Sequence, residues 1–124
     1  MATSHSLPDA HAIQERVAAI GFDWPDARGA WEKVREELEE VKGELARVGQ
    51  TELEEEIGDL LFSVINMSRL ARVDPEAALI RANRKFVRRF AMVEELAADR
   101  GIVMADAGLE ALDRLWDEAK REER

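Results

Sequence analysis

The sequence predicts an all-α protein, an antiparallel bundle of about five helices. Three observations support this fold class. Apolar residues recur at three- and four-residue spacing, the 7 Gly and 3 Pro are sparse and mark the breaks, and no stretch alternates as a strand would. No internal repeat or low-complexity linker is visible, and 124 residues suit one domain. We therefore expect a short tail at residues 1–6 and a single helical domain at residues 7–124.

The first two helices are separated by a short connector. A helix is expected over residues 9–20, ending before Gly21, and residues 21–26 form the connector. The second helix carries apolar residues spaced alternately three and four apart, which predicts a narrow seam facing partner helices. The seam residues are Trp31, Val34, Leu38, Val41, Leu45 and Val48. Gly49 is expected to end this helix.

Three further helices complete the predicted bundle. The third begins at Thr51, which forms a capping box with Glu54, and runs to about residue 71. The fourth begins at Asp74 and Pro75, because Asp accepts backbone N–H bonds at an N-cap and Pro needs no donor at the first helical position. Gly101 ends it, and a last helix starts at about residue 106.

Charge and composition exclude several classes of function. The formal net charge of −9 argues against a nucleic-acid or anionic membrane surface as the main partner. The chain has no Cys, which excludes disulfides, thiolate metal sites and thiol nucleophiles. The first eight residues do not read as a signal peptide, and no stretch approaches the length of a membrane span. We expect a cytoplasmic protein.

Acidic residues follow the apolar seam of the second helix. Glu37, Glu40 and Glu44 each directly precede a seam residue, so they form one stripe beside the buried edge. A run of Glu on a helix is otherwise typical of a solvated face. The position of these residues indicates that they border the core.

The third helix carries Asp59 inside a stretch that is apolar on nearly every side, which predicts a helix covered all round. An ionised carboxylate in such surroundings is costly unless it is paired or binds a metal. Glu56 lies one turn earlier on the same stripe. We expect Asp59 to have a partner.

Two carboxylate pairs, Glu37 with Glu40 and Glu56 with Asp59, are therefore expected to face each other between antiparallel helices. Converging carboxylates repel one another unless cations lie between them, and oxygen ligands suit Mg²⁺ or Mn²⁺. A di-iron bundle would need Glu-x-x-His, and the chain has no His beyond His11. The alternative is an acidic surface in which one Asp pairs with an Arg.

Cationic and aromatic residues further along the chain suit a phosphorylated substrate, which commonly completes the coordination of Mg²⁺. Lys85 and Arg89 lie four apart on one face of the fourth helix and could hold a triphosphate; ordinary surface charge pairing is the alternative. Trp116 and Lys120 have the same spacing, but Trp at this spacing is more often a core residue. Asn66 orients a water, a metal ligand or a base edge, or is a satisfied buried amide.

Four short motifs make the chain resemble the MazG-type nucleoside triphosphate pyrophosphohydrolases, from about residue 7 to residue 122. The paired acidic motif, Glu-Glu-x-x-Glu followed by Glu-Glu-x-x-Asp, is specific when the surrounding helices also match. The motifs are Gly21-Phe22-Asp23-Trp24, Lys33-Val34-Arg35-Glu36-Glu37-Leu38-Glu39-Glu40-Val41, Glu55-Glu56-Ile57-Gly58-Asp59-Leu60-Leu61-Phe62 and Asn83-Arg84-Lys85-Phe86-Val87-Arg88-Arg89-Phe90.

The resemblance implies hydrolysis of a nucleoside triphosphate to the monophosphate and pyrophosphate, with Mg²⁺ bound at Glu37, Glu40, Glu56 and Asp59. It implies substrate binding at Lys85, Arg89, Trp116 and Lys120. It also implies a four-helix core completed by a homodimer or a dimer of dimers. Three alternatives remain at this point: a narrower dUTP, dCTP or phosphoribosyl-ATP pyrophosphohydrolase, a non-catalytic helical adaptor dimer, and a module that binds nucleotide without hydrolysing it.

Overall fold

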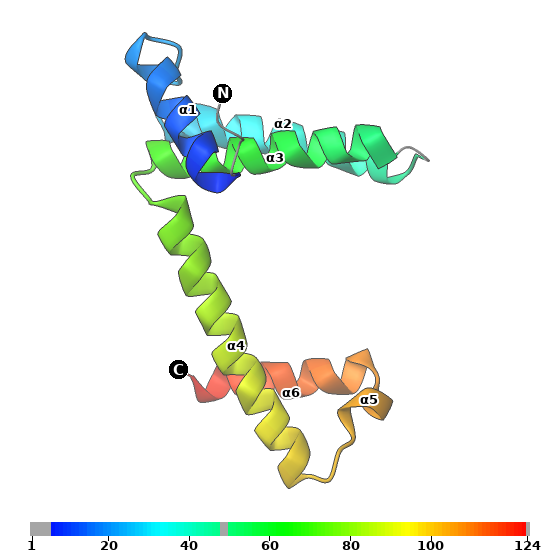
Figure 1. The fold of residues 1–124 in the computed structure, drawn as a ribbon. Helices are drawn as coiled ribbons and strands as arrows, with labels where there is room; N and C mark the ends of the chain where they lie inside the picture. Colours follow the sequence, from blue (N-terminus) through cyan, green and yellow to red (C-terminus); the bar gives the residue numbers. More distant parts are fainter. Residues whose placement is uncertain (1–5, 48–49, 124) are drawn as a thin grey trace. The chain divides into compact units, whose positions relative to one another are not determined.

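The computed structural model describes residues 6–47 and 50–123, and within them the chain is all-α, as predicted (Figure 1). The described residues form six helices and no strand. The sixth helix, beyond the five or so expected, is the four-residue α5. The helices are α1 (Leu7–Ala19), α2 (Ala27–Leu45), α3 (Gln50–Leu70), α4 (Pro75–Asp99), α5 (Met104–Ala107) and α6 (Leu109–Glu122).

The helices group into two compact units, Met1–Ala78 and Leu79–Arg124, and α4 begins in the first and continues into the second. Each unit has its own packed residues, described below. None of the helices in the described part of the chain combines the length and apolar character needed to cross a membrane.

Capping explains two of the helix starts. Asp26 accepts hydrogen bonds from the backbone N–H groups of Arg28 and Gly29 at 3.0 and 3.3 Å, which begins α2. Asp74 accepts from Glu76 N–H at 3.0 Å, which confirms the predicted N-cap of α4. The capping box predicted at Thr51 is wrong, because α3 already begins at Gln50 and Thr51 lies inside its first turn.

The first unit is built on α2 and α3, which run antiparallel side by side (Figure 1). The row of α2 that is buried consists of Ala30, Val34, Glu37 and Val41. This corrects the predicted seam in one respect, because Trp31, Leu38 and Leu45 are exposed. These three lie seven residues apart on an adjacent row of the helix. Val48 and Gly49 lie outside the described residues.

Helix α1 packs on α3 through a buried polar contact. Gln14 is only 2% exposed, and its Nε2 donates to the backbone oxygen of Phe62 at 2.9 Å. The connector then returns the chain to α2, where the ring of Trp24 lies against Gly29, 3.0 Å from the point where a Cβ would stand. Any larger residue at position 29 would displace this ring. The connector is thereby held close to the start of α2.

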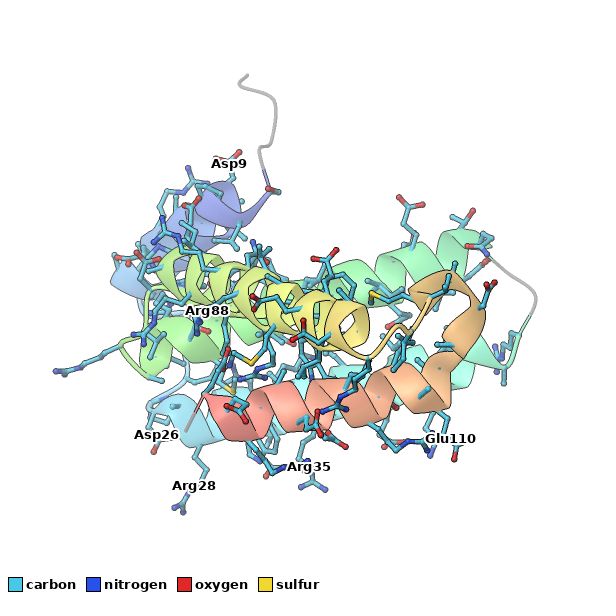
Figure 2. All side chains as sticks on the ribbon, turned by 90° about the horizontal axis from the view of Figure 1, so that it is seen from below. Asp9, Asp26, Arg28, Arg35, Arg88 and Glu110 are labelled. Atoms are coloured by element: carbon cyan, nitrogen blue, oxygen red, sulfur yellow. The ribbon has the colours of Figure 1, made fainter. Side chains whose placement is uncertain are left out.

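The second unit has a core formed by α4 and α6. Val93 and Ala97 of α4 pack with Leu115 and Ala119 of α6, and all four are at most 3% exposed. Met104 of α5 is among the partly buried residues that border this core. In Figure 2, the charged side chain of Glu110 extends away from its own helix, α6.

Candidate metal centre

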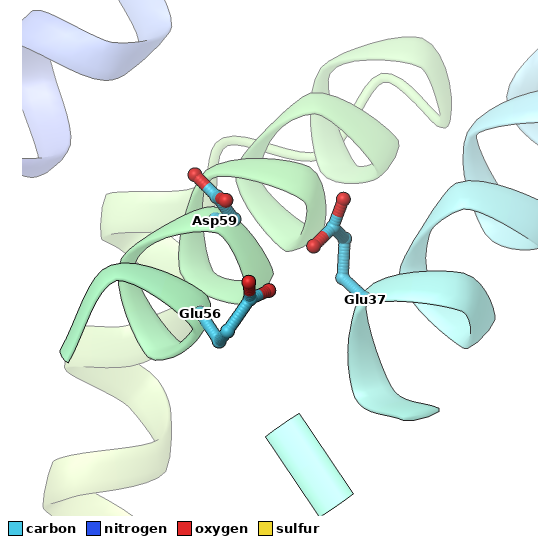
Figure 3. Close-up of side chains that lie close together, drawn as sticks. All are labelled: Glu37, Glu56 and Asp59. Carbon is cyan, nitrogen blue, oxygen red and sulfur yellow. The ribbon is translucent and has the colours of Figure 1, made fainter. Parts of the chain in front are cut away.

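Three carboxylates from α2 and α3 converge within the first unit (Figure 3). Helix α2 supplies Glu37, and α3 supplies Glu56 and Asp59 from successive turns. One oxygen from each residue lies within 4.8 Å of the others. We call these three residues the carboxylate centre. The antiparallel packing expected from the sequence brings them together, although they come from different helices.

Burial differs sharply among the three residues. Glu37 is 9% exposed and belongs to the buried row of α2, Glu56 is half-buried, and Asp59 is exposed. The prediction that Asp59 lies in a helix covered all round is therefore wrong for this chain. Neighbouring apolar residues such as Ile57, Leu61 and Phe62 are 40–59% exposed. The carboxylate that needs compensation for desolvation is Glu37 instead.

Lys33 supplies that compensation. Its Nζ lies 3.0 Å from Glu37 Oε1, and the hydrogen bond to Glu37 raises the pKa of Lys33. The two residues are four apart on α2, so a cationic side chain one turn before a buried acid was visible in the sequence. Sequence reasoning missed it because the burial of Glu37 could not be read from the spacing. Lys33 balances one of the three negative charges.

The pKa of Glu56 is raised, first by burial and then by the negative charges of Glu40 and Asp59, with smaller effects from Glu37 and Glu44. The contribution of the neighbouring acids to this shift is the repulsion that converging carboxylates produce. Glu40 is exposed and lies outside the group of three oxygens. It contributes to the centre through its charge on Glu56, and its predicted role as a direct ligand remains untested.

The donor set suits a hard divalent cation. All three ligand atoms are carboxylate oxygens, and cations that prefer oxygen ligands, such as Mg²⁺ and Ca²⁺, are held in this way. A bound cation would also relieve the repulsion that raises the pKa of Glu56. On both counts the residues present fit a metal ion.

Asn66 lies on α3 beyond the carboxylate centre, where it is half-buried and held by Arg69. Arg69 Nε and Nη2 donate to Asn66 Oδ1 at 3.1 and 2.9 Å. Arg69 Nη2 also donates to Asp23 Oδ1, which lowers the pKa of Asp23. Sequence reasoning missed Arg69, because the residue it bridges to, Asp23, lies 46 positions away.

The second unit holds the other four predicted substrate-binding residues. Arg89 Nε and Nη2 donate to Glu123 Oε2 at 3.2 and 2.9 Å, and the guanidinium carbon lies 5.3 Å from the centre of the Trp116 ring. Trp116 also packs against Phe86, with ring centres 4.9 Å apart. Together with Arg88, we call Arg89, Trp116 and Glu123 the Arg89 cluster. Lys85 and Lys120 are exposed.

The Arg89 cluster makes internal contacts that the sequence did not predict. The hydrogen bond to Arg89 is the main cause that lowers the pKa of Glu123, and Arg88 adds a second cation at 3.5 Å. Trp116 borders the core of the second unit, which was the alternative weighed for it. Arg89 and Trp116 thus have structural partners in the chain, and their roles in substrate binding remain predictions.

Comparison with known proteins identifies a family. A family model described as the MazG nucleotide pyrophosphohydrolase domain matches residues 29–94, which contain the carboxylate centre, Asn66, Lys85 and Arg89. Trp116 and Lys120 lie outside the match.

Two curated relatives are similar over almost the whole chain. The nucleoside triphosphate pyrophosphohydrolase/pyrophosphatase MazG of Thermotoga maritima is 49% identical over 115 residues, which cover 93% of this chain and 44% of that protein. The nucleoside triphosphate pyrophosphohydrolase of Escherichia coli K12 is 44% identical over 120 residues, which cover 95% of this chain and 46% of that protein. The chain thus spans less than half the length of these relatives. On the family match and these identities, the chain belongs to the MazG nucleotide pyrophosphohydrolase domain family.

Proposed function

We propose that this chain hydrolyses nucleoside triphosphates to the nucleoside monophosphate and pyrophosphate in a reaction that requires Mg²⁺, with Mn²⁺ as a substitute. The observation that carries the proposal is the carboxylate centre, which lies inside the segment that matches the family model. The names of the relatives from Thermotoga maritima and Escherichia coli support the same reaction.

Glu37, Glu56 and Asp59 would hold the metal, with Glu40 as the fourth acid of the site. When bound, the metal would supply a Lewis acid that polarises a phosphoryl oxygen and lowers the pKa of a bound water. Lys33 pairs with Glu37 and holds its side chain on the buried face of α2. Lys85, Arg89, Trp116 and Lys120 are proposed to bind the phosphates and the base, and Asn66 to contact the substrate nearer the carboxylates.

We further propose that the protein acts as a homodimer, alone or as a dimer of dimers. Four apolar residues of α3 are 37–59% exposed and would be covered by a partner helix: Ile57, Leu61, Phe62 and Val64. We propose a cytoplasmic location, because nucleoside triphosphates are available in that compartment.

The test is pyrophosphate release from a panel of ribo- and deoxyribonucleoside triphosphates with Mg²⁺, with Mn²⁺ and with a chelator. Glu56→Ala removes one member of the carboxylate centre. Glu54→Ala is the matched control, since Glu54 is an exposed acid on the same helix and is not part of the centre. We expect divalent-dependent release of pyrophosphate that is lost in Glu56→Ala and retained in Glu54→Ala.

Two results would contradict the proposal. Release of orthophosphate in place of pyrophosphate would mean that a different phosphoanhydride bond is cleaved. Divalent-dependent binding of nucleotide without turnover of any substrate in the panel would assign the chain to a binding module.

A further inference from the structure

Arg69 connects two residues that are far apart in the sequence. Its Nη2 donates to Oδ1 of Asp23, in the connector after α1, and its Nε and Nη2 donate to Oδ1 of Asn66 on α3. The same Asp23 oxygen accepts the backbone N–H of Trp24 at 2.9 Å. The side chains of Arg69 and Asp23 are 14% and 23% exposed, so these charge-assisted bonds are partly shielded from water.

This arrangement determines which way the Asn66 amide faces. Arginine carries only donors, so the Asn66 atom that faces Arg69 must be the amide oxygen. The Nδ2 hydrogens therefore face away from Arg69, and no hydrogen bond from Nδ2 to an acceptor is found among the residues that the structure describes. Asn66 Nδ2 is thus available to donate a hydrogen bond to a ligand.

The open donor lies on the face of α3 that carries the carboxylate centre. Asn66 follows Asp59 by seven residues, which in an α-helix is a rotation within about 20° of the same direction and a rise of about 10 Å. A nucleotide whose phosphates lie at the carboxylates extends its sugar and base over a comparable length. An acceptor on the nucleoside, rather than on a phosphate, is therefore within the range of Asn66.

We infer that Asp23 and Arg69 are positioning residues, which hold the Asn66 amide so that Nδ2 donates to an acceptor atom of the nucleoside part of the substrate. The inference rests on the proposed function and adds the residues that prepare its nucleoside subsite. Arg69 Nη2 donates to both partners, and Nε adds a second hydrogen bond to Asn66 Oδ1. Lysine has neither the Nε donor nor the rigid planar geometry of the guanidinium group, so it would orient the Asn66 amide less strictly.

A double-mutant cycle between Asn66→Ala and Arg69→Lys tests this inference. The readout is the Kd for an α,β-methylene nucleoside triphosphate with Mg²⁺, which does not depend on turnover. We expect each single variant to weaken binding about tenfold, the effect of losing one hydrogen bond of this kind. The double variant should bind no more weakly than Asn66→Ala, because Arg69 acts through Asn66.

Thermal unfolding separates a positioning role from a structural one. A purely structural Arg69 would lower the Tm in both backgrounds and weaken binding by the same factor with and without Asn66, which would overturn the inference. Asp23→Asn gives a second route if Arg69→Lys does not fold, and it should weaken binding in wild type but not in Asn66→Ala. Additive effects in both cycles would likewise overturn it.

Substrate analogues identify the acceptor. If it is a sugar hydroxyl, the penalty of Asn66→Ala should vanish with a 2′-deoxy or a 3′-deoxy analogue; if it is on the base, the penalty should persist with both. Failure of the proposed function can be told apart from failure of this inference. In the first case, wild type would bind the analogue and the double-mutant cycle would be non-additive, yet no triphosphate would release pyrophosphate. If wild type is active but the effects in both cycles are additive, the inference is refuted and the proposed function stands.

Discussion

The carboxylate centre of the first unit and the Arg89 cluster of the second have opposite balances of acidic and basic side chains. At the centre, three acids converge and Lys33 balances one of them, and burial together with the neighbouring negative charges raises the pKa of Glu56. In the Arg89 cluster, two cations contact one acid, so the pKa of Glu123 is lowered. A site that leaves like charges unbalanced is suited to a charged ligand, whereas a site that pairs them also stabilises the fold. The three predictions that follow test this difference.

The largest effect on stability is expected from the core that supports the Arg89 cluster. Leu115 is 3% exposed and packs against α4, so Leu115→Ala should lower the free energy of unfolding by about 2–5 kcal/mol. Denaturant unfolding measures this loss. At temperatures where the variant stays folded, its requirement for divalent ions should be unchanged. A lost ion requirement would contradict the assignment of the metal to the first unit.

The second prediction concerns membership of the carboxylate centre. Glu37→Gln removes a charge from the group of three oxygens and should lower kcat/KM by about 100-fold or more, while Glu40→Gln should cost about tenfold, since Glu40 acts on Glu56 through its charge. The Mg²⁺ dependence of pyrophosphate release measures both. Equal losses in the two variants would make Glu40 a full ligand, as the sequence predicted.

The smallest effect is a difference in the pH dependence of stability. The pKa of Glu56 lies above its ordinary value of 4.5, so ionisation of Glu56 destabilises the metal-free fold. The contribution of protonated Glu56 to stability is fully present below the unfolded pKa and is lost as pH rises through the folded pKa. The pKa of Glu123 lies below 4.5, so its stabilisation is present above the unfolded pKa and is lost as pH falls through the folded pKa.

Thermal unfolding of Glu56→Gln and Glu123→Gln in chelator, compared with wild type, tests these signs. Glu56→Gln should become relatively more stable as pH rises from about 4 towards neutral, whereas Glu123→Gln should be less stable than wild type near neutral pH and approach it in acid. Differences of the same sign and pH trend in the two variants would break the comparison between the two regions.

The location of the carboxylates illustrates how far the sequence could be taken. The spacing of the acids on two helices correctly predicted that Glu37, Glu56 and Asp59 lie close together, because helical periodicity fixes which residues share a face. The order of burial was wrong: Asp59 was expected to be enclosed, but Glu37 is the buried acid. Burial depends on which rows of side chains on α2 and α3 face each other. The spacing of apolar residues does not say whether a given row lies in that contact or beside it.

The sequence by itself determined the helical class, the positions of the main helices within a few residues, the acidic motifs and the resemblance to the MazG family. These depend on local periodicity, capping and short motifs. Tertiary structure alone decided that Glu37 is the enclosed carboxylate, that Arg89 pairs with Glu123, and that Arg69 joins Asp23 to Asn66. Two of these are contacts between residues 34 and 46 positions apart, and all three depend on how helices and connector pack, which no local pattern encodes.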